Sequence, residues 1–399
     1  MSGQSPLNNA SSERKKLMRN YSMGIYIHIP FCIRKCNYCD FFSVPLPAKE
    51  YLQRYTNALV AEISQRAHEG AGKKIESVYF GGGTPSLLST EQLETIIRAL
   101  DDNFRLPADM EISMEANPAS LNARKIQDFT NAGINRLSLG VQSFSNDDLR
   151  VLTRIHSAED VRVLIDILHS QGLENFNIDL IYGIPGQSMD RWIKSLQTAA
   201  DSSPMHISMY LLQLDPGTPM AMDIKKGRMA MLDEERELEM YTLGREYLQG
   251  RGFDHYEISN FSFPGRECKH NLIYWQAGEY IGIGCGAVSF MDKSRFINKP
   301  DLKAYLYAIE NRQERPVEEI EKMSHKGLIA DAIILGLRLC SGINMEKFRS
   351  RYGIDISREY SEVIKSCSQK GLLKIENGQI SLTRKGYFLS NEVLCQFIA

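Results

Sequence analysis

Long apolar runs are missing from this sequence. No stretch approaches the roughly 20 apolar residues that a membrane-spanning helix needs, and residues 1–22 lack the apolar centre of a secretory signal. We therefore expect a cytoplasmic protein. An excess of one charge is missing as well: the 47 Lys and Arg residues are balanced by 49 Asp and Glu residues, which argues against binding nucleic acid or membrane surfaces through bulk electrostatics.

Paired cysteine knuckles, the usual framework of a structural zinc site, are also missing. Three of the eight cysteines, Cys32, Cys36 and Cys39, fall within eight positions. The other five are scattered through the chain: Cys268, Cys285, Cys340, Cys367 and Cys395. This distribution indicates one metal site in a reducing compartment and argues against a disulfide framework.

Residues 23–262 alternate short β-branched or apolar runs with longer segments of helical periodicity, which is typical of βα units around a parallel sheet. The expected strands are 24–29, 75–80, 110–115, 135–141, 175–182 and 206–212, with a seventh over 254–259 at the edge. The expected helices lie near 49–69, 90–102, 120–132, 157–171, 188–201 and 232–249. Six units are too few for a closed eight-stranded barrel, so we expect an α/β fold with a partial, open (β/α)6 TIM-like barrel.

The pattern changes after a Gly-rich stretch at residues 280–290. The expected elements are then helices near 301–312, 324–339 and 358–369 and a hairpin whose turn is Asn377-Gly378. This order predicts a small α+β domain of the winged-helix type. Residues 301–399 carry 15 Lys and Arg against 13 Asp and Glu, so a structural or protein-contact role is favoured over DNA binding. The expected domains are a disordered polar tail over 1–22, a core domain over 23–295 and this C-terminal domain over 296–399.

The three clustered cysteines form C-x3-C-x2-C on a loop directly after the first expected strand. Such spacing lets one loop wrap a cuboidal iron–sulfur cluster, whose usual ligands are thiolates. Three close thiols without an obvious fourth leave one iron open. The alternative is a Cys3His zinc site that uses His28, which the absence of a second ligand knuckle disfavours. We therefore predict a [4Fe–4S] cluster on Cys32, Cys36 and Cys39.

Two further strand ends carry features that suit a ligand. The turn Gly81-Gly82-Gly83 follows the second expected strand and has no Cβ atom, so bare backbone can approach a bound molecule. Glu115 ends the third strand, where its carboxylate could accept hydrogen bonds from hydroxyl or amino groups. The structural alternatives are a tight loop for the glycines and a solvated acid for Glu115.

The cysteine motif, with aromatic Tyr38 before Cys39, resembles the signature of the radical S-adenosylmethionine (SAM) superfamily. The segments YIHIPFC, GGGTPS, EANP, LSLGVQSF, NIDLIYGIPGQ and YIGIGCGAVSF extend the resemblance to the oxygen-independent coproporphyrinogen oxidase (HemN) group over most of residues 24–290. This resemblance implies a radical SAM barrel in which the open iron of the cluster binds the amino and carboxylate groups of SAM. The protein's share is to position SAM and exclude water.

Site residues follow from the resemblance position by position. Those implied to contact the cluster-bound SAM are Tyr26, Tyr38, Gly82 and Glu115. Those that match a second SAM site are Gly83, Thr84, Gln142, Arg154 and Asp179. Taken without the motif, Arg154 is more typical of a surface ion pair and Asp179 of a buried polar group on a strand.

One position departs from the oxidases, which carry a fourth cysteine two residues after the third. Here that position is Phe41. This difference, the shorter chain and the compact C-terminal domain resemble the haem chaperones of the HemW type within the same group. Coproporphyrinogen oxidase activity is therefore doubtful, and no catalytic residue is assigned.

A second feature agrees with that resemblance. The segment H-N-x-x-Y-W resembles the haem-binding motif proposed for HemW, and it implies haem contacts for His270, Asn271, Tyr274 and Trp275. A histidine beside two aromatic rings can ligate haem iron and pack on the macrocycle. Cys268 could act as a thiolate ligand instead. Without the family context, such a group is more typical of a buried core or interface cluster.

The sequence therefore favours a haem chaperone that binds a [4Fe–4S] cluster, SAM and haem as cargo. The implied partners are haem, haem-accepting respiratory proteins that include membrane proteins, a reductant for the cluster and a second copy of the chain. The alternative is an oxygen-independent coproporphyrinogen III oxidase that decarboxylates a tetrapyrrole by radical chemistry. A DNA-binding regulator that uses the winged-helix module is a third hypothesis, and nucleic acid is the least favoured partner.

Overall fold

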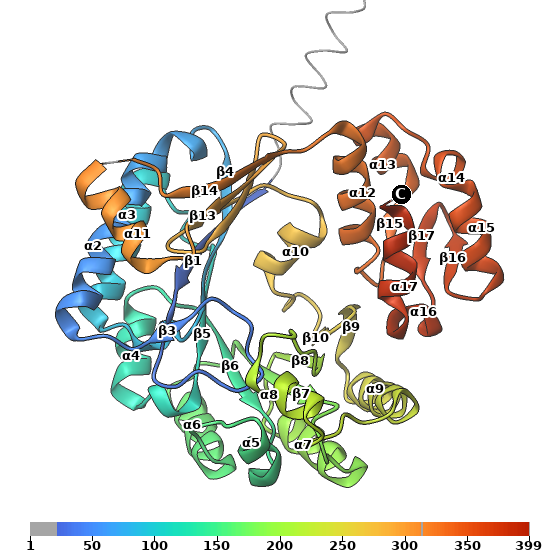
Figure 1. Cartoon of the computed structure of the whole chain (residues 1–399), viewed down its shortest axis with the longest axis horizontal. Coiled ribbons are helices and arrows are strands. Elements are labelled where there is room, and N and C mark those ends of the chain that lie inside the picture. The colour runs from blue at the N-terminus through green and yellow to red at the C-terminus, as the bar shows by residue number, and fades with distance from the viewer. Residues whose placement is uncertain (1–21, 313, 399) are drawn as a thin grey trace, which may run out of the picture.

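The computed structural model describes residues 22–312 and 314–398. Its centre is a curved sheet of twelve strands in the order β14-β13-β12-β11-β1-β4-β5-β6-β7-β8-β10-β9 (Figure 1). The expected tail over residues 1–22 lies outside the described residues, apart from Ser22. Among the described residues no sheet closes into a barrel, as the open (β/α)6 prediction required.

The six expected βα units are confirmed. Neighbouring strands of the units pair in parallel. They are β1 (Ser22–Ile29), β4 (Lys74–Gly82), β5 (Glu111–Ala116), β6 (Arg136–Gln142), β7 (Phe176–Tyr182) and β8 (His206–Leu211). Because the units all run in the same direction, the carboxyl ends of these strands meet at one edge of the sheet, where ligands of such folds bind.

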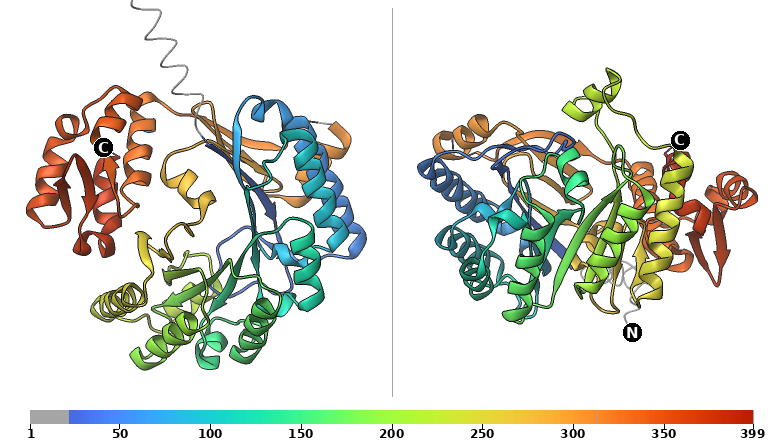
Figure 2. Two further views of the ribbon diagram at one scale, coloured as in Figure 1. Left: turned by 180° about the vertical axis from the view of Figure 1, so that it is seen from behind. Right: turned by 90° about the horizontal axis from the view of Figure 1, so that it is seen from below.

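Helices cover the outer, convex face of the sheet (Figures 1 and 2). They are α2 (Lys49–Arg66), α3 (Thr90–Phe104), α4 (Ala123–Asn131), α5 (Asn146–Val151), α6 (Ala158–Ser170), α7 (Met189–Asp201) and α9 (Glu234–Gly250). Local sequence fixes several starts: Ser89 begins α3 with a capping box to Gln92, and Ser157 begins α6 with one to Asp160. Their apolar stripes and the outward strand residues, such as Val78 and Phe80, form the main core.

The inner, concave face of the same strands is polar. Alternate residues point inward, among them Ser77 and Tyr79 of β4, Glu115 of β5, Ser138 of β6 and Asp179 of β7. A parallel sheet that is packed with helices on both faces has continuous apolar strands, and this one does not. The alternation therefore marks the inner face as a ligand-binding surface. The short α10 (Lys269–Trp275) lies against it in the region of β1 and β4 (Figure 1).

The sheet extends beyond the βα units on both sides. One extension is β11 (Tyr280–Ile283), parallel to β1, followed by the antiparallel β12 (Val288–Met291), β13 (Ser294–Asn298) and β14 (Val317–Lys322). The other is the expected edge near residues 254–259, which forms β10 (Asn260–Ser262) and β9 (Asp254–Glu257). The first extension was not predicted, because glycines interrupt β11 and its neighbours and β14 is an exposed acidic segment.

The C-terminal segment has its own apolar core and a three-stranded sheet, β15-β17-β16, in the winged-helix-like order that was expected. Asn377 and Gly378 both have positive φ angles, of 50° and 73°, as a two-residue hairpin turn requires. The elements are α12 (His325–Gly336), β15 (Ile343–Asn344), α13 (Met345–Tyr352), α14 (Ile356–Glu359), α15 (Ser361–Gln369), β16 (Leu373–Glu376), β17 (Gln379–Leu382), α16 (Arg384–Phe388) and α17 (Ser390–Leu394). The expected boundary after residue 295 falls inside β13, and α11 (Leu302–Tyr307) and β14 follow it before this segment begins.

Candidate functional site

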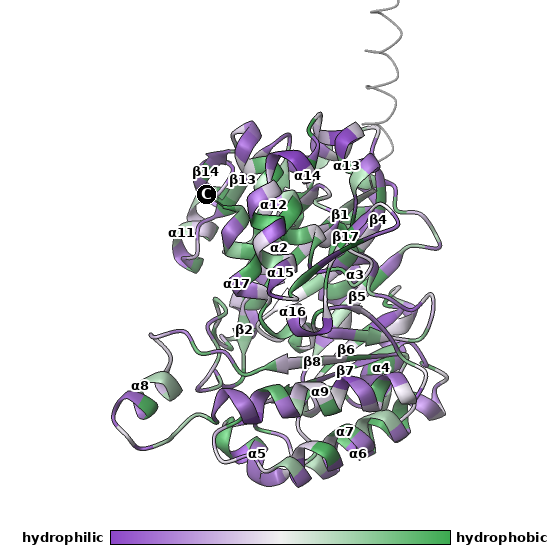
Figure 3. Ribbon diagram, turned by 90° about the vertical axis from the view of Figure 1, so that its right-hand side faces the viewer, coloured by the Kyte–Doolittle hydropathy of each residue, from purple (hydrophilic) through white to green (hydrophobic). Residues whose placement is uncertain are grey.

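The cysteine loop leaves β1 through the short strand β2 (Phe31–Cys32), which pairs with β3 (Val44–Pro45). The loop is anchored to the far side of the sheet edge: the Asn37 N–H donates to Thr153 Oγ1 at 3.0 Å, and the Met220 N–H donates to the Asn37 carbonyl at 2.9 Å. Met220 belongs to α8 (Pro219–Lys225), which stands off the end of the sheet (Figure 3). These anchors hold the loop over the carboxyl ends of the parallel strands.

The three thiols of this loop lie in one neighbourhood. Burial raises the pKa of the Cys39 thiol, and the nearby Cys36 and Cys32 thiols raise it further. Thr84 Oγ1 lies 3.6 Å from Cys32 Sγ, and Arg154 Nη1 lies 3.5 Å from Cys36 Sγ. The other five cysteines have contacts elsewhere, with Glu111, Lys299, Tyr387, Gln396 and Glu392. The donor set around the loop is therefore three thiols with hydrogen-bond donors beside them, which fits an iron–sulfur cluster with one open iron.

The zinc alternative loses its fourth ligand. His28 is buried, with its Nδ1 2.9 Å from the Tyr26 hydroxyl and its Nε2 3.0 Å from the Phe42 carbonyl. Burial lowers the pKa of His28, and both ring nitrogens already have protein partners. Across the described ranges, no three His, Cys, Asp or Glu side chains, the three loop thiols included, are arranged to hold a single metal ion, which argues against a mononuclear zinc site. His28 is thus a structural residue that fixes the phenol of Tyr26.

The glycine turn lies against β1 so closely that side chains are excluded. A Cβ atom on Gly83 would lie 2.7 Å from the Phe31 carbonyl oxygen, and one on Gly82 would lie 2.5 Å from the His28 ring. Gly82 also has a φ of 113°, a conformation that residues with a side chain rarely adopt. Packing against β1 therefore requires glycine at both positions, as the tight-loop alternative expected.

Glu115 joins the glycine turn to the polar inner face. Its carboxylate accepts hydrogen bonds from the Gly82 N–H at 3.1 Å and from the Tyr79 hydroxyl at 3.0 Å. Burial raises the pKa of Glu115 to about 7, and the neighbouring Asp179 carboxylate contributes to the rise. Asp179 itself accepts from Ser138 at 3.1 Å and from Asn177 at 2.8 Å. These two carboxyl groups are buried where a bound amine or hydroxyl could partner them.

Arg154 connects the cysteine loop to β6. One guanidinium nitrogen donates to the Gly140 carbonyl at 2.6 Å, another contacts Cys36, and Tyr38 is a further hydrogen-bond partner. Gln142 is nearby at the end of β6 with a φ of 69°. Arg154 Nε is buried without a hydrogen-bond partner within the described residues. An unpaired, buried donor on a cationic group suits an anionic ligand such as a carboxylate.

His270 does not face open space. It is 1% exposed and stacks on Tyr79 with ring centroids 5.1 Å apart. Its Nδ1 lies 2.8 Å from Ser77 Oγ, and its Nε2 lies 2.8 Å from the Tyr274 hydroxyl. Burial lowers the pKa of His270 to about 3 and raises the pKa of Cys268 to about 12. Both candidate iron ligands from the H-N-x-x-Y-W segment are therefore enclosed by protein.

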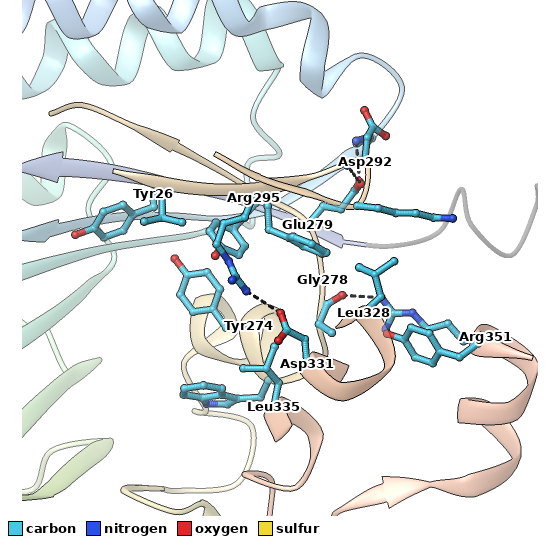
Figure 4. A pocket seen from close by; sticks show the side chains of 18 of the residues that line it. Tyr26, Tyr274, Gly278, Glu279, Asp292, Arg295, Leu328, Asp331, Leu335 and Arg351 are labelled. Carbon is cyan, nitrogen blue, oxygen red and sulfur yellow. Dashed lines mark hydrogen bonds and ion pairs between the residues drawn. The ribbon is translucent and has the colours of Figure 1, made fainter. Parts of the chain in front are cut away.

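A cavity of about 1700 Å³ opens beside this segment. In Figure 4, Tyr26 and Arg295 reach the cavity from the sheet, Tyr274 from α10, and Asp331 from α12. The structure brings Tyr274 and Trp275 to its wall, whereas His270 and Asn271 are not among the lining residues. The cysteine loop reaches the same cavity through Phe41, which is 65% exposed.

Comparison with known proteins shows the family of this chain. The model of the radical SAM superfamily matches residues 26–199, and that of the HemN C-terminal domain matches residues 323–389. The heme chaperone HemW of Bacillus subtilis is 34% identical over 377 residues, which cover 94% of this chain and 98% of that protein. The chain belongs to the HemW family of radical SAM proteins. HemW of Escherichia coli is 38% identical over 274 residues, covering 68% of this chain and 71% of the relative.

The HemW family shares its fold with the oxidases. The structure of coproporphyrinogen III oxidase (HemN) from Escherichia coli, a radical SAM enzyme, matches with a TM-score of 0.82 at 22% identity, covering 99% of this chain and 93% of that chain. Membership of the radical SAM superfamily implies a [4Fe–4S] cluster and SAM. None of the helices in the described part of this HemW-family chain is long and apolar enough to cross a membrane.

Sequence reasoning missed one wall of the cavity. It is formed by β12 and β13 and by α12 and α13, with Phe290, Arg295, Leu328 and Asp331 among the lining side chains. A signal was present, because residues 325, 328, 331 and 335 follow helical spacing and lie on one face of α12. It could not be read as a site without knowing which surface that face opposes.

Proposed function

We propose that this protein is a haem chaperone, in which a cluster and SAM at the sheet edge share a wall with a haem-binding cavity. One observation carries the proposal. The loop with Cys32, Cys36 and Cys39 continues into Phe41 and Phe42, which line the cavity. A change at the cluster therefore has a direct route to the cargo. The chaperone role itself is the one that the relatives from Bacillus subtilis and Escherichia coli are named for.

Cys32, Cys36 and Cys39 are the residues that would hold the [4Fe–4S] cluster. When bound, the cluster would supply an open coordination position for SAM and one electron at a time. Arg154 and Thr84 donate toward the sulfur atoms of Cys36 and Cys32, respectively. Hydrogen bonds of this kind stabilise thiolate charge and tune the potential of a cluster. The fourth position has no thiol on the loop, because Phe41 stands there.

SAM would lie on the polar inner face beside the cluster loop. The bare backbone of Gly82 and Gly83 allows close approach, the Glu115 carboxyl would accept from its amino or ribose groups, and Arg154 would pair with its carboxylate. Tyr26 and Asp179 lie beside Glu115, and their hydroxyl and carboxyl would complete the polar lining. The residues proposed for SAM are thus those from the sequence: Tyr26, Tyr38, Gly82, Gly83, Thr84, Glu115, Gln142, Arg154 and Asp179.

The cavity has the size and chemistry for haem. At about 1700 Å³ it exceeds the roughly 300–1000 Å³ of most small-molecule pockets. Tyr274, Trp275 and Phe41 offer aromatic surface to a macrocycle. Lys347 and Arg349 of α13 are exposed lining residues, and their charges suit the two propionates of haem.

We place this activity in the cytoplasm, with haem passed on to respiratory haemoproteins, a reductant serving the cluster, and a second copy of the chain as a further partner. We also propose that the chain folds as two units that divide near residue 323, where the main sheet has ended at Lys322 and α12 begins the second core.

The decisive experiment is a haemin titration of the anaerobically reconstituted full chain, run in parallel with a coproporphyrinogen turnover assay. We expect one haem per chain, transfer to an apo-haemoprotein, and no turnover with SAM and reductant. Cys36→Ala removes a cluster ligand, and Cys395→Ala, an exposed cysteine in the C-terminal segment, is its matched control. Anaerobic decarboxylation of coproporphyrinogen would favour the oxidase instead, and absence of stoichiometric haem binding would rule out the chaperone.

A further inference from the structure

The cavity contains few side chains that can coordinate iron through an imidazole, the commonest protein ligand of haem. Among the described residues that line it, histidine occurs at His28 and His325. His28 is 5% exposed, and its two nitrogens contact the Tyr26 hydroxyl and the Phe42 carbonyl. Coordination of iron through either nitrogen of His28 would break the buried contact that this nitrogen makes. His28 is therefore a poor ligand.

His270, the histidine of the H-N-x-x-Y-W segment, meets the same obstacle outside the cavity. Ser77 and Tyr274 contact its two nitrogens, each at 2.8 Å. Freeing the Nε2 atom would leave the Tyr274 hydroxyl without this partner and would require the ring to leave its stack on Tyr79. A buried polar group that loses its partner destabilises the fold. The contacts assign His270 to holding α10 on the sheet.

His325 differs from both. It is exposed, and within the described part of the chain no hydrogen bond or ion pair involves its ring. It is the first residue of α12, whose cavity face continues through Leu328, Asp331 and Leu335 at helical spacing. Both nitrogens are therefore available on a side chain that borders the cavity.

The position of α12 is fixed relative to the aromatic wall. Asp331 forms a 2.7 Å ion pair with Arg295 of β13, which joins the helix to the sheet across the cavity (Figure 4). Arg351 of α13 donates to the carbonyls of Gln276 and Ala277, directly after α10, at 2.7 and 2.6 Å. These links hold the α12 face and the Tyr274 and Trp275 wall at a set spacing, as a planar ligand requires.

We propose that His325 is the axial ligand of the haem iron, and that His270 positions the aromatic wall without touching the metal. This inference rests on the proposed haem-binding function and adds the coordinating residue to it. The macrocycle would pack on Tyr274 and Trp275, with its propionates toward Lys347 and Arg349. A tyrosine ligand is less suited: Tyr280 also lines the cavity, but burial raises its pKa and disfavours the phenolate.

The test compares haemin bound to the reconstituted full-length wild type and to His325→Ala by absorption and electron paramagnetic resonance spectroscopy. We expect the wild type to show imidazole ligation and His325→Ala to lose it, with a Kd about tenfold higher, equivalent to about 1.4 kcal/mol. Added imidazole should restore the spectrum of the variant. His68→Ala, an exposed histidine of the segment after α2, is the matched control and should behave as the wild type.

Two results would overturn the inference, and they are distinguishable. If the wild type binds haem but His325→Ala keeps the imidazole spectrum, or if the wild type shows tyrosinate ligation, the ligand assignment is wrong and the chaperone proposal stands. If the wild type binds no haem, both are wrong. A His270→Gln variant adds a further check, because we expect it to lower the unfolding midpoint while the iron spectrum stays that of an imidazole complex.

Discussion

Arg154 contacts Cys36 Sγ through Nη1 at 3.5 Å and donates to the Gly140 carbonyl through Nη2 at 2.6 Å. One side chain thereby ties the cysteine loop to the end of β6. The contact also places a permanent positive charge beside a thiol that must be deprotonated to bind iron.

Replacing Arg154 by Met should therefore weaken retention of the cluster. We expect the reconstituted variant to lose iron several-fold faster than the wild type during exposure to air, because Cys36 loses its cationic neighbour and the loop loses an anchor. Iron content and cluster absorbance over time provide the measurement. Arg162→Met, on the exposed face of α6, is the control. Equal decay of both variants would show that Arg154 serves SAM alone.

The Gly82 position should reject even the smallest side chain. In Gly82→Ala the methyl group would meet the His28 ring at 2.5 Å in a backbone conformation with φ of 113°. We expect a loss of unfolding free energy of about 1–3 kcal/mol and a lower affinity for SAM. Urea denaturation and SAM titration measure the two effects.

The control variant Gly72→Ala distinguishes backbone strain at a positive φ from a steric clash of the added methyl group. Gly72 has a φ of 74°, and a Cβ atom there has no neighbour within 4 Å. This control should cost only the conformational penalty and leave SAM binding unchanged. A Gly82→Ala protein as stable as Gly72→Ala would mean that the His28 ring moves away at little cost.

Glu115 should make the protein less stable as the pH rises. Its folded pKa of about 7 lies above its ordinary value of 4.5, so the folded state holds a proton that the unfolded state releases. The contribution of this proton to the free energy of unfolding is at its full value below about pH 4.5 and is lost as the pH rises toward 7. The total is at most about 3.5 kcal/mol, from about 1.4 kcal/mol per pH unit.

Glu115→Gln removes this titration and keeps an oxygen that can accept from Gly82 or Tyr79. We expect the variant to gain stability relative to the wild type between pH 5 and pH 7, as measured by urea denaturation of the apoprotein. Other buried acids, such as Glu62 and Glu257, titrate equally in both proteins and cancel. Parallel pH profiles would show that Glu115 is ionised throughout this range.

The sequence was sufficient for the βα units and the cysteine loop, because both are encoded locally. Alternating apolar runs predict strands and helices, and C-x3-C-x2-C lies within one loop. The environment of His270, in contrast, depends on residues that are distant in the sequence. Its partner Ser77 lies 193 positions away, and only the packing of α10 against β4 brings the two together. Sequence reasoning found the segment but could not show that its imidazole is already occupied.

The cavity was hidden for the same reason. Its walls come from β1, α10, β11–β13, α12 and α13, and β14 extends the sheet without an apolar pattern. Charged residues such as Arg295 and Asp331 are common on any surface, so their pairing across the cavity has no signature in the sequence. A site built from distant segments becomes visible only in the fold.

We expect Phe41 to contribute to haem binding and not to retention of the cluster. Its side chain lines the cavity and is 65% exposed, so the apoprotein leaves a large apolar ring in water beside the proposed haem site. Burying such a ring against a macrocycle stabilises the complex by about 1.5–3 kcal/mol. We expect Phe41→Ser to raise the Kd for haem by at least tenfold while iron content and SAM affinity stay unchanged.

Ile33→Ser is the control, since Ile33 lies on the same loop, is 52% exposed and does not line the cavity. Parallel haemin titrations and iron assays distinguish the cases. Loss of haem binding in both variants would indicate a general effect of loop polarity, whereas loss of iron in Phe41→Ser alone would mean that Phe41 shields the cluster and not the cargo.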